Sequence, residues 1–192
     1  MSTPQQAEVL KILADIFDEL NIKYAIGGSV ASSIFGTPRF TQDADITVQL
    51  SIPAAESLYE KVSGHFYISK EAMYQAVNSK SSFNIIHLDA VFKIDKFIPN
   101  SEFENTLIAR SHKNKIDESI AKEFSLVSPE DVILLKLKWY KMADCASDRQ
   151  WSDVRGVLSV QKNKIDYDYL KIWANKLGLA NLLEKAISEV KK

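Results

Sequence analysis

The chain has 192 residues, a formal net charge of −1 at pH 7 and 46% hydrophobic residues. This length suits one domain or a catalytic domain with a small appendage, and the apolar share is enough for a sizeable core. The near-neutral charge gives no global reason to expect tight nucleic-acid binding, and Cys145 as the only cysteine excludes an internal disulfide. Residues 1–6 lack the layout of a secretory signal and no apolar run reaches membrane-spanning length, so we expect a soluble cytoplasmic protein without membrane contact.

The first 127 residues alternate between helical and strand patterns. Apolar spacing predicts helices over residues 4–20, 29–35, 53–62, 71–77 and 102–110, and strands over residues 24–26, 46–50, 65–68, 83–88 and 91–98. Asp89-Ala90 between the last two strands predicts a hairpin, and residues 112–127 have room for one or two further strands.

From Ser128 onward every pattern is helical. Ser128 is a favourable cap, Pro129 suits the first turn, and the acids that follow complement the helix dipole. Three apolar stripes predict packed helices whose tryptophans belong to the core: Val132, Leu135 and Trp139; Trp151, Val154, Val157 and Leu158; Tyr169, Ile172, Trp173 and Leu177. A last helix is expected over residues 179–190, so the sequence predicts an α/β domain at 1–127 and a helical domain at 128–192.

One short segment near the N-terminus carries most of the chemical information. Gly27 and Gly28 permit close approach of the backbone to a phosphate, and Ser29 opens a helix whose N–H groups attract anions. Asp43 and Asp45, two residues apart, present their carboxylates on the same side of a strand. Such a pair repels unless a cation lies between the two groups, and oxygen ligands of this kind suit Mg²⁺. The segment therefore predicts a phosphate-binding turn beside a metal site.

This order of motifs resembles the DNA polymerase β-like nucleotidyltransferase superfamily, whose signature is Gly-Ser, a short helix and Asp-x-Asp on a strand, here Gly28-Ser29 and Asp43-Ala44-Asp45. The added Arg39-Phe40-Thr41 is similar to the AbiEii-type branch, the nucleotidyltransferase-like toxins of type IV toxin–antitoxin systems. The resemblance implies an α/β (α+β) nucleotidyltransferase fold with a mixed sheet and a C-terminal helical bundle. It also makes Arg39 and Thr41 nucleotide-binding candidates, although Arg39 is equally explained as a surface turn residue.

Two metal ions about 3.5–4 Å apart normally need a third carboxylate on a neighbouring strand. Asp95 lies inside an apolar strand, where an acid needs a reason, whereas Asp89 lies at the predicted hairpin turn, where Asp is common. We choose Asp95, because the third acid of AbiEii-like relatives also tends to follow a Lys-apolar pair, and we keep Asp89 as the alternative. Asp95 would then be a metal ligand or the base for the acceptor hydroxyl; a charge that protects an edge strand is its structural explanation.

A second group of candidates lies in the helical part, where Lys136, Arg149 and Asp153 resemble later AbiEii-like motifs. The resemblance implies that Lys136 contacts the triphosphate and that Asp153 orients it or assists at the active site. Arg149 would do either, or hold Asp153 in a bidentate pair. A solvated basic helix face with an ordinary i, i+4 Arg–Asp pair explains the same residues almost as well.

Taken together, the motifs predict a Mg²⁺-dependent nucleotidyltransferase, with two ions, that moves a nucleoside monophosphate from an NTP to an acceptor hydroxyl. The acceptor is RNA or tRNA, a protein or a small molecule, and a toxin-like role with a cognate antitoxin is the more specific hypothesis. The alternative is a non-catalytic nucleotide-binding or partner-binding module of a toxin–antitoxin pair.

Overall fold

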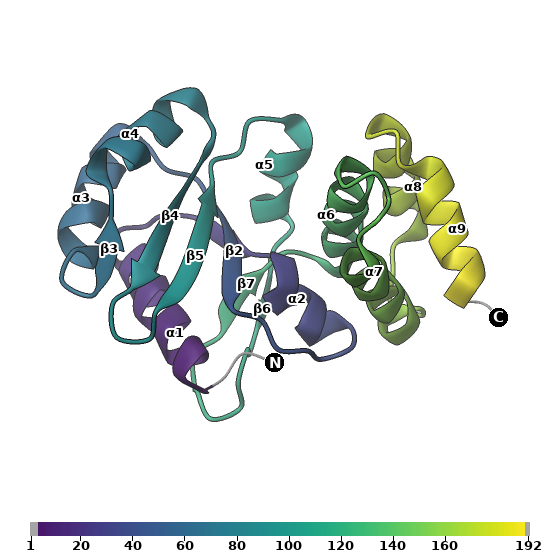
Figure 1. The fold of residues 1–192 in the computed structure, drawn as a ribbon, viewed down its shortest axis with the longest axis horizontal. Helices are drawn as coiled ribbons and strands as arrows, with labels where there is room; N and C mark the ends of the chain where they lie inside the picture. The colour runs from purple at the N-terminus through teal and green to yellow at the C-terminus, as the bar shows by residue number, and fades with distance from the viewer. Residues whose placement is uncertain (1–3, 191–192) are drawn as a thin grey trace.

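The computed structural model describes residues 4–190 and contains a seven-stranded mixed sheet (Figure 1). The strands are β1 (Tyr24–Ile26), β2 (Asp43–Val48), β3 (Phe66–Ile68), β4 (Ser82–His87), β5 (Phe92–Phe97), β6 (His112–Asn114) and β7 (Phe124–Leu126), in the spatial order β3-β4-β5-β2-β1-β7-β6. β2 runs parallel to β5 and antiparallel to β1, and β1 runs parallel to β7. The expected mixed sheet is confirmed.

The helices follow the predicted order closely. They are α1 (Pro4–Glu19), α2 (Gly28–Phe35), α3 (Ile52–Val62), α4 (Lys70–Ser79), α5 (Glu102–Ala109), α6 (Pro129–Met142), α7 (Asp148–Gln161), α8 (Tyr167–Lys176) and α9 (Ala180–Val190). Ser128 caps α6 by accepting a hydrogen bond from the Asp131 backbone, as its sequence predicts. Within residues 4–190, none of these helices combines the length and apolar character needed to cross a bilayer.

The pairing of β2 with β5 determines where the acidic residues lie. Residues Asp43 and Ala44, expected to precede the strand, belong to it because they continue the ladder with Lys93 and Ile94 of β5. The same register places Asp45 directly opposite Asp95. The predicted hairpin is formed by β4 and β5, and its turn carries the alternative acid, Asp89.

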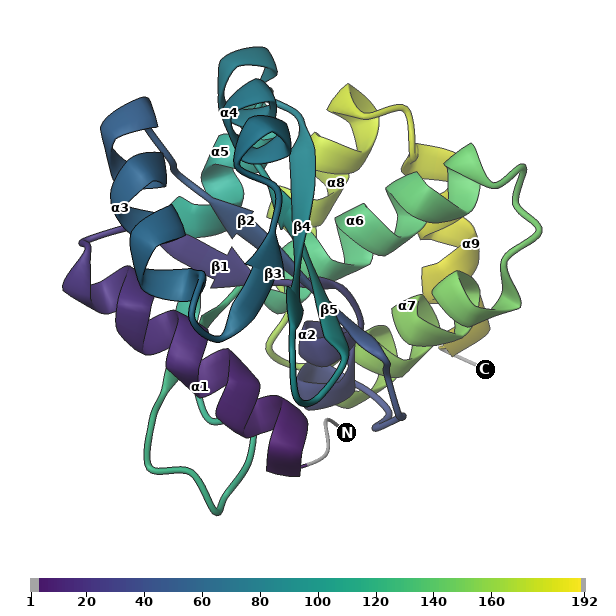
Figure 2. The same cartoon turned by 60° about the vertical axis from the view of Figure 1, so that its left-hand side comes forward.

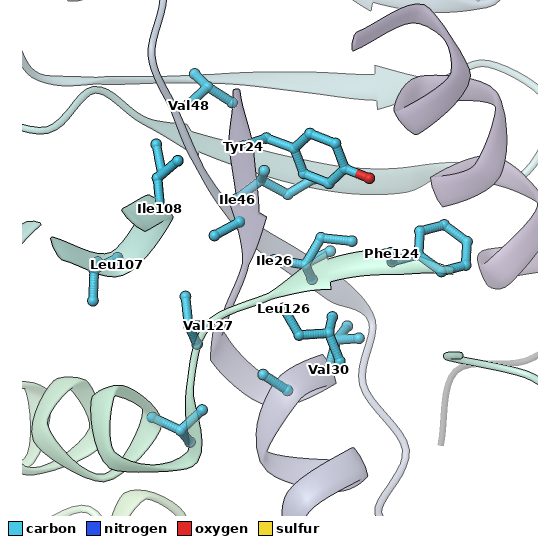
Figure 3. Close-up of a cluster of buried hydrophobic side chains, with 14 of the residues drawn as sticks. Tyr24, Ile26, Val30, Ile46, Val48, Leu107, Ile108, Phe124, Leu126 and Val127 are labelled. Atoms are coloured by element: carbon cyan, nitrogen blue, oxygen red, sulfur yellow. The ribbon is translucent and has the colours of Figure 1, made fainter. Parts of the chain in front are cut away.

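One buried apolar cluster fills the space around the sheet. Figure 3 shows Ile26 of β1, Ile46 of β2 and Leu126 of β7 gathered above Val30 of α2. α1 lies across one side of the sheet (Figure 2), where Phe17 packs against Tyr24 with ring centroids 5.2 Å apart. The cluster continues without a break into α6–α9, so the division between residues 127 and 128, which falls between β7 and α6, stays a prediction.

Two glycines bring α2 into close contact with α7, at the lower centre of Figure 1. A Cβ on Gly36 would lie only 2.7 Å from the backbone nitrogen of Val157, and a Cβ on Gly156 would lie 3.1 Å from that of Thr37. The side-chain amide of Gln161 donates to the Phe35 carbonyl at 2.9 Å across the same contact. The C-terminal helices are therefore seated directly on the helix that follows the glycine turn.

Lys96 of β5 is an unusual component of the core. Its side chain points away from the face that carries Asp95, because neighbouring residues of a strand alternate between faces. It is 0% exposed, and its Nζ has no hydrogen-bond partner among the described residues and lies 5.9 Å from the centre of the Phe17 ring. Burial lowers the pKa of Lys96 well below the ordinary value, although Asp95 and Asp45 act in the opposite direction.

We predict that Lys96→Met raises the free energy of unfolding at pH 7 by about 1–3 kcal/mol, because the variant removes an unpaired buried polar group. Because the pKa of Lys96 is lower in the folded than in the unfolded chain, wild-type stability should rise as the pH increases from the folded-state pKa toward about 10.4, and the variant should lose this part of the slope. Urea denaturation at several pH values measures both effects. Lys23→Met, at an exposed position, is the control. A less stable Lys96→Met protein would contradict the prediction.

Candidate active site

A cavity of about 460 Å³ lies between the Asp45 side of the sheet and helices α5, α6 and α7. Its walls include the turn at residues 27–29, the β2 residues Asp43, Asp45 and Thr47, and Lys136 of α6. This volume falls within the range of about 300–1,000 Å³ that is usual for small-molecule sites. The cavity therefore joins the glycine turn and the paired acids that the sequence singled out.

The glycine turn touches the acidic strand directly. Gly28 has φ +56°, and a Cβ at this position would overlap the Asp45 carboxylate. The Gly27 N–H donates to the Asp45 carbonyl at 2.8 Å, which fixes the turn against β2. Only glycine satisfies both the positive φ and the close approach. α2 begins at Gly28, so the N–H groups of its first turn, which have no intrahelical acceptors, lie beside the Asp45 carboxylate.

Each of the three candidate acids has a different environment. Asp43 is exposed, and its Oδ1 accepts a hydrogen bond from the Thr41 hydroxyl at 2.9 Å. Asp45 is partly buried, and its carboxylate lies against Gly28. Asp95, opposite Asp45, has its Oδ2 2.9 Å from the Nζ of Lys93. The structure thus brings the three acids to neighbouring positions of two strands and places Asp89, exposed in the hairpin turn, outside this group.

Burial and the Asp43 carboxylate raise the pKa of Asp45 to about 6. Asp95 acts in the same direction, whereas Lys136 and Lys93 favour the charged form. The carboxylate of Asp45 is therefore held in its site at an electrostatic cost. A divalent cation next to it would remove that cost.

The donor set is suited to magnesium in one respect and incomplete in another. Two carboxylates on one side of a strand, beside a turn suited to phosphate, match the preference of Mg²⁺ for one or two carboxylates together with substrate phosphates and water. Within residues 4–190, however, no group of three His, Cys, Asp or Glu side chains is placed to hold a metal ion. Asp95, the third acid, is instead paired with Lys93. Asp43 and Asp45 are the residues that fit the ion.

An ion network lies next to the cavity and joins three segments of the chain. The Arg39 guanidinium donates from Nε and Nη2 to the two carboxylate oxygens of Asp153, both at 2.9 Å, and Nη2 also donates to the Ser29 hydroxyl. Lys136, only 4% exposed, places its Nζ 2.8 Å from Asp153 Oδ2. Burial opposes ionisation of Asp153, but the two cations hold its pKa below the ordinary value.

The predicted nucleotide-binding residues divide between the cavity wall and its support. Gly27, Gly28, Ser29, Lys136 and Arg149 line the cavity together with Asp43 and Asp45. Within residues 4–190, Arg39, Thr41, Asp153 and Asp95 do not line it. Thr41 is 5% exposed, and its hydroxyl donates a hydrogen bond to the Asp43 carboxylate.

One predicted interaction is corrected. The bidentate partner of Asp153 is Arg39, far away in the sequence, rather than Arg149 on the same helix. Arg149 is exposed and lies at the cavity. The i, i+4 spacing suggested the wrong pair because a buried carboxylate is satisfied by the cations that reach it from α6 and from the loop after α2.

Several cavity residues were missed or misassigned from the sequence. The stripe Val132, Leu135 and Trp139 lines the cavity. Val132 is in the core and Leu135 packs against it, but Trp139, also expected in the core, is 47% exposed. Lys138 of α6 and Glu104 of α5, both on the wall, form an ion pair of 3.1 Å. Apolar periodicity finds the inward face of a helix but does not distinguish a packed core from the wall of a cavity.

No protein-family model and no curated protein sequence matches the chain. Solved structures do. A nucleotidyltransferase-like antigenic protein from Paracoccidioides brasiliensis has a TM-score of 0.62 at 17% identity, covering 98% of this chain and 94% of that chain. The chain has a nucleotidyltransferase fold.

Two other solved structures with the nucleotidyltransferase fold modify antibiotics. ANT(2'')-Ia in complex with adenylyl-2''-tobramycin has a TM-score of 0.58 at 15% identity, covering 90% of this chain and 97% of that chain. The lincosamide antibiotic adenylyltransferase LnuA, bound to lincomycin, has a TM-score of 0.54 at 14% identity, covering 83% of this chain and 98% of that chain. At these identities the likeness shows the nucleotidyltransferase fold alone, and function has to be argued from the site.

We predict that Asp45→Asn stabilises the protein at pH 7, in the absence of divalent ions, by about 1–3 kcal/mol. Because the folded-state pKa of about 6 lies above the ordinary aspartate value of 3.8, wild-type stability falls as pH rises through this window. The variant should lose that fall and match the wild type near pH 4. Urea denaturation in a chelating buffer tests this, with Asp89→Asn in the hairpin turn as the control. An unchanged or lower stability at pH 7 would contradict the prediction.

We predict that Asp153→Ala lowers the free energy of unfolding by about 3–5 kcal/mol, because it leaves Lys136 buried without its counter-ion. Arg149→Ala, at an exposed position on the same helix, should change it by less than about 0.5 kcal/mol. Thermal and urea denaturation of the two variants provide the comparison. Equal effects would show that the Arg39–Asp153–Lys136 network does not stabilise the fold.

Proposed function

We propose that the protein is a Mg²⁺-dependent nucleotidyltransferase that transfers a nucleoside monophosphate from an NTP to an acceptor hydroxyl. The observation that carries this proposal is the contact of Gly28 with Asp45 in the wall of one cavity. It supports a site in which the phosphates of a nucleotide and the metal-binding acids meet at one point. The nucleotidyltransferase fold makes such a site expected at this position.

Different residues of the cavity would bind the phosphates and the metal ion. The backbone N–H groups at Gly28 and Ser29 would bind the β- and γ-phosphates, with the dipole of α2 favouring their negative charge. Lys136 and Arg149 would neutralise further phosphate charge from the opposite wall. Asp43 and Asp45 would hold Mg²⁺, which, when bound, neutralises the charge that develops on the attacking and leaving oxygens.

The surrounding residues hold this arrangement in place. Thr41 orients Asp43 through its hydroxyl, and Arg39 orients Ser29 while it neutralises Asp153. Asp95, opposite Asp45, would act as a further ligand or as the base that takes the proton of the acceptor hydroxyl, after parting from Lys93. These contacts would keep the glycine turn, the acids and Lys136 at fixed positions relative to one another.

A small hydroxylated molecule is the acceptor that we favour. Two of the similar structures act on antibiotics, and the net charge of −1 provides no global field that attracts RNA. RNA, tRNA and protein acceptors remain alternatives. The finer hypothesis of a toxin-like enzyme with a cognate antitoxin rests on sequence resemblance alone, chiefly that of Arg39-Phe40-Thr41.

We predict that the purified protein labels an acceptor when incubated with α-³²P-NTPs and MgCl₂. Separate reactions should contain tobramycin with lincomycin, total RNA, and cell lysate, so that the labelled species identifies the acceptor class. Asp45→Asn should reduce labelling by about 10²-fold or more, because it removes a charge that stabilises the transition state. Lys171→Ala, on the exposed face of α8, should retain full activity. Labelling that persists in Asp45→Asn would contradict the assignment of the site.

A non-catalytic nucleotide-binding module is the second candidate, favoured by the Lys93–Asp95 ion pair, which engages the third acid. The two functions differ in a simple measurement. A module would show a nucleotide-dependent rise in melting temperature with MgCl₂ but no labelled product from any acceptor mixture, whereas an enzyme would show both. The absence of any melting shift with all four NTPs would contradict both functions.

A further inference from the structure

The three tryptophans of the chain have very different surroundings. The ring of Trp151 packs on Tyr140 at 4.9 Å, and its Nε1 donates to Glu189 at 3.1 Å. Trp173 packs on Phe103 at 5.2 Å. Within residues 4–190, the indole of Trp139 has neither a ring contact nor a hydrogen bond, and the residue is 47% exposed on the wall of the candidate active site. A large aromatic surface is thus presented to the cavity without a partner.

Trp139 belongs to an apolar wall that becomes more exposed with distance from the glycine turn. Val132 is 1% exposed, Trp139 47% and Met142 64%, and all three line the cavity from α6. Lys136, the proposed phosphate ligand, precedes Trp139 by one turn, about 4.5 Å along the helix axis. An NTP whose phosphates lie at Lys136 and Gly28 would therefore direct its nucleoside along this wall.

The part of the cavity wall that α7 forms beside α6 carries a polar group that lacks a partner. Gln150 of α7 lines the cavity, and its Oε1 is buried without a hydrogen-bond donor among the described residues. A buried amide oxygen normally has a partner, so this acceptor requires an N–H or O–H group from a ligand or water. A glutamine amide pairs well with adenine, since it accepts from N6–H and donates to N7.

We propose that Trp139 is the stacking platform for the base of the donor nucleotide and that Gln150 reads its amino edge, which makes ATP the preferred donor. This inference rests on the proposed function, because it assumes that the phosphates bind at the glycine turn. Stacking on an aromatic side chain tolerates any base, and the larger purine face gains more from it than a pyrimidine. Gln150 then distinguishes adenine from uracil, which lacks an exocyclic amine.

The test is equilibrium binding of ATP, UTP and inorganic tripolyphosphate in MgCl₂, measured by calorimetry. In the wild type, ATP should bind more tightly than UTP and tripolyphosphate. Trp139→Ala should weaken ATP binding by about 5–150-fold and leave tripolyphosphate binding unchanged, whereas Trp139→Phe should recover most of the loss. Gln150→Leu should reduce the preference for ATP over UTP. Ile172→Ala removes a comparably exposed apolar side chain from α8 and should have no effect.

The outcomes separate the two proposals. If wild-type protein binds neither ATP nor tripolyphosphate, the proposed function fails. If tripolyphosphate and ATP bind and Trp139→Ala changes ATP affinity by less than twofold, only the stacking platform is overturned. Loss of acceptor affinity alone in Trp139→Ala would assign the indole to the acceptor and overturn the base assignment. If the alanine variant does not fold, Trp139→Phe replaces it in a fluorescence titration with ATP. Stacking on Trp139 should change tryptophan fluorescence in the wild type, and most of this change should be lost in Trp139→Phe; an undiminished change would overturn the stacking platform.

Discussion

The contact between Gly28 and Asp45 is the constraint on which the site depends. The backbone at residue 28 lies so close to the Asp45 carboxylate that no side chain fits between them, and the hydrogen bond from Gly27 to the Asp45 carbonyl keeps it there. The anion-attracting end of α2 and a partly buried carboxylate are thereby held side by side. The N-terminus of α2 favours an anion and the carboxylate favours a cation. A ligand that carries both a negative group and a cation satisfies both at one position. A nucleotide with its metal ion does so.

The ion network around Asp153 extends this constraint to the rest of the molecule. Arg39 comes from the loop after α2, Lys136 from α6 and Asp153 from α7, so one carboxylate connects the sheet side of the cavity with its helical side. Lys136 therefore serves the site in two ways, as a counter-ion for Asp153 and as a positive charge on the cavity wall. The desolvation of these groups is tolerated because each charge has a partner within hydrogen-bond distance.

Much of the fold could be predicted from the sequence, because hydrophobic periodicity and helix capping act locally. The start of α6 at Ser128-Pro129 and the β4–β5 hairpin are examples. The start of β2 could not be predicted, because Asp43 is held in the strand by pairing with Lys93, a residue fifty positions away. Long-range pairs of this kind depend on register, which periodicity does not determine.

The same distinction applies to the candidate site. Gly28, Ser29, Asp43 and Asp45 could be found because Asp43 and Asp45 are two residues apart in a strand and because the order of the two motifs resembles a known signature. The partner of Asp153 could not, since the Arg39–Asp153 pair spans more than a hundred residues. Trp139 was assigned to the core because an apolar stripe indicates which side of a helix faces inward, and here the inward side borders a cavity.

The glycine contact between α2 and α7 has a consequence for how ligands enter and leave. Gly36 and Gly156 allow the two helices to approach within van der Waals distance, and such an interface loses its packing as soon as the helices separate. We therefore do not expect α2 and α7 to separate when the cavity opens. Product would instead escape through the rim of the cavity near the end of α6, where Met142 and Arg149 are surface residues. For the proposed reaction, release would then require movements of side chains and of the short α6–α7 connection rather than rotation of whole domains.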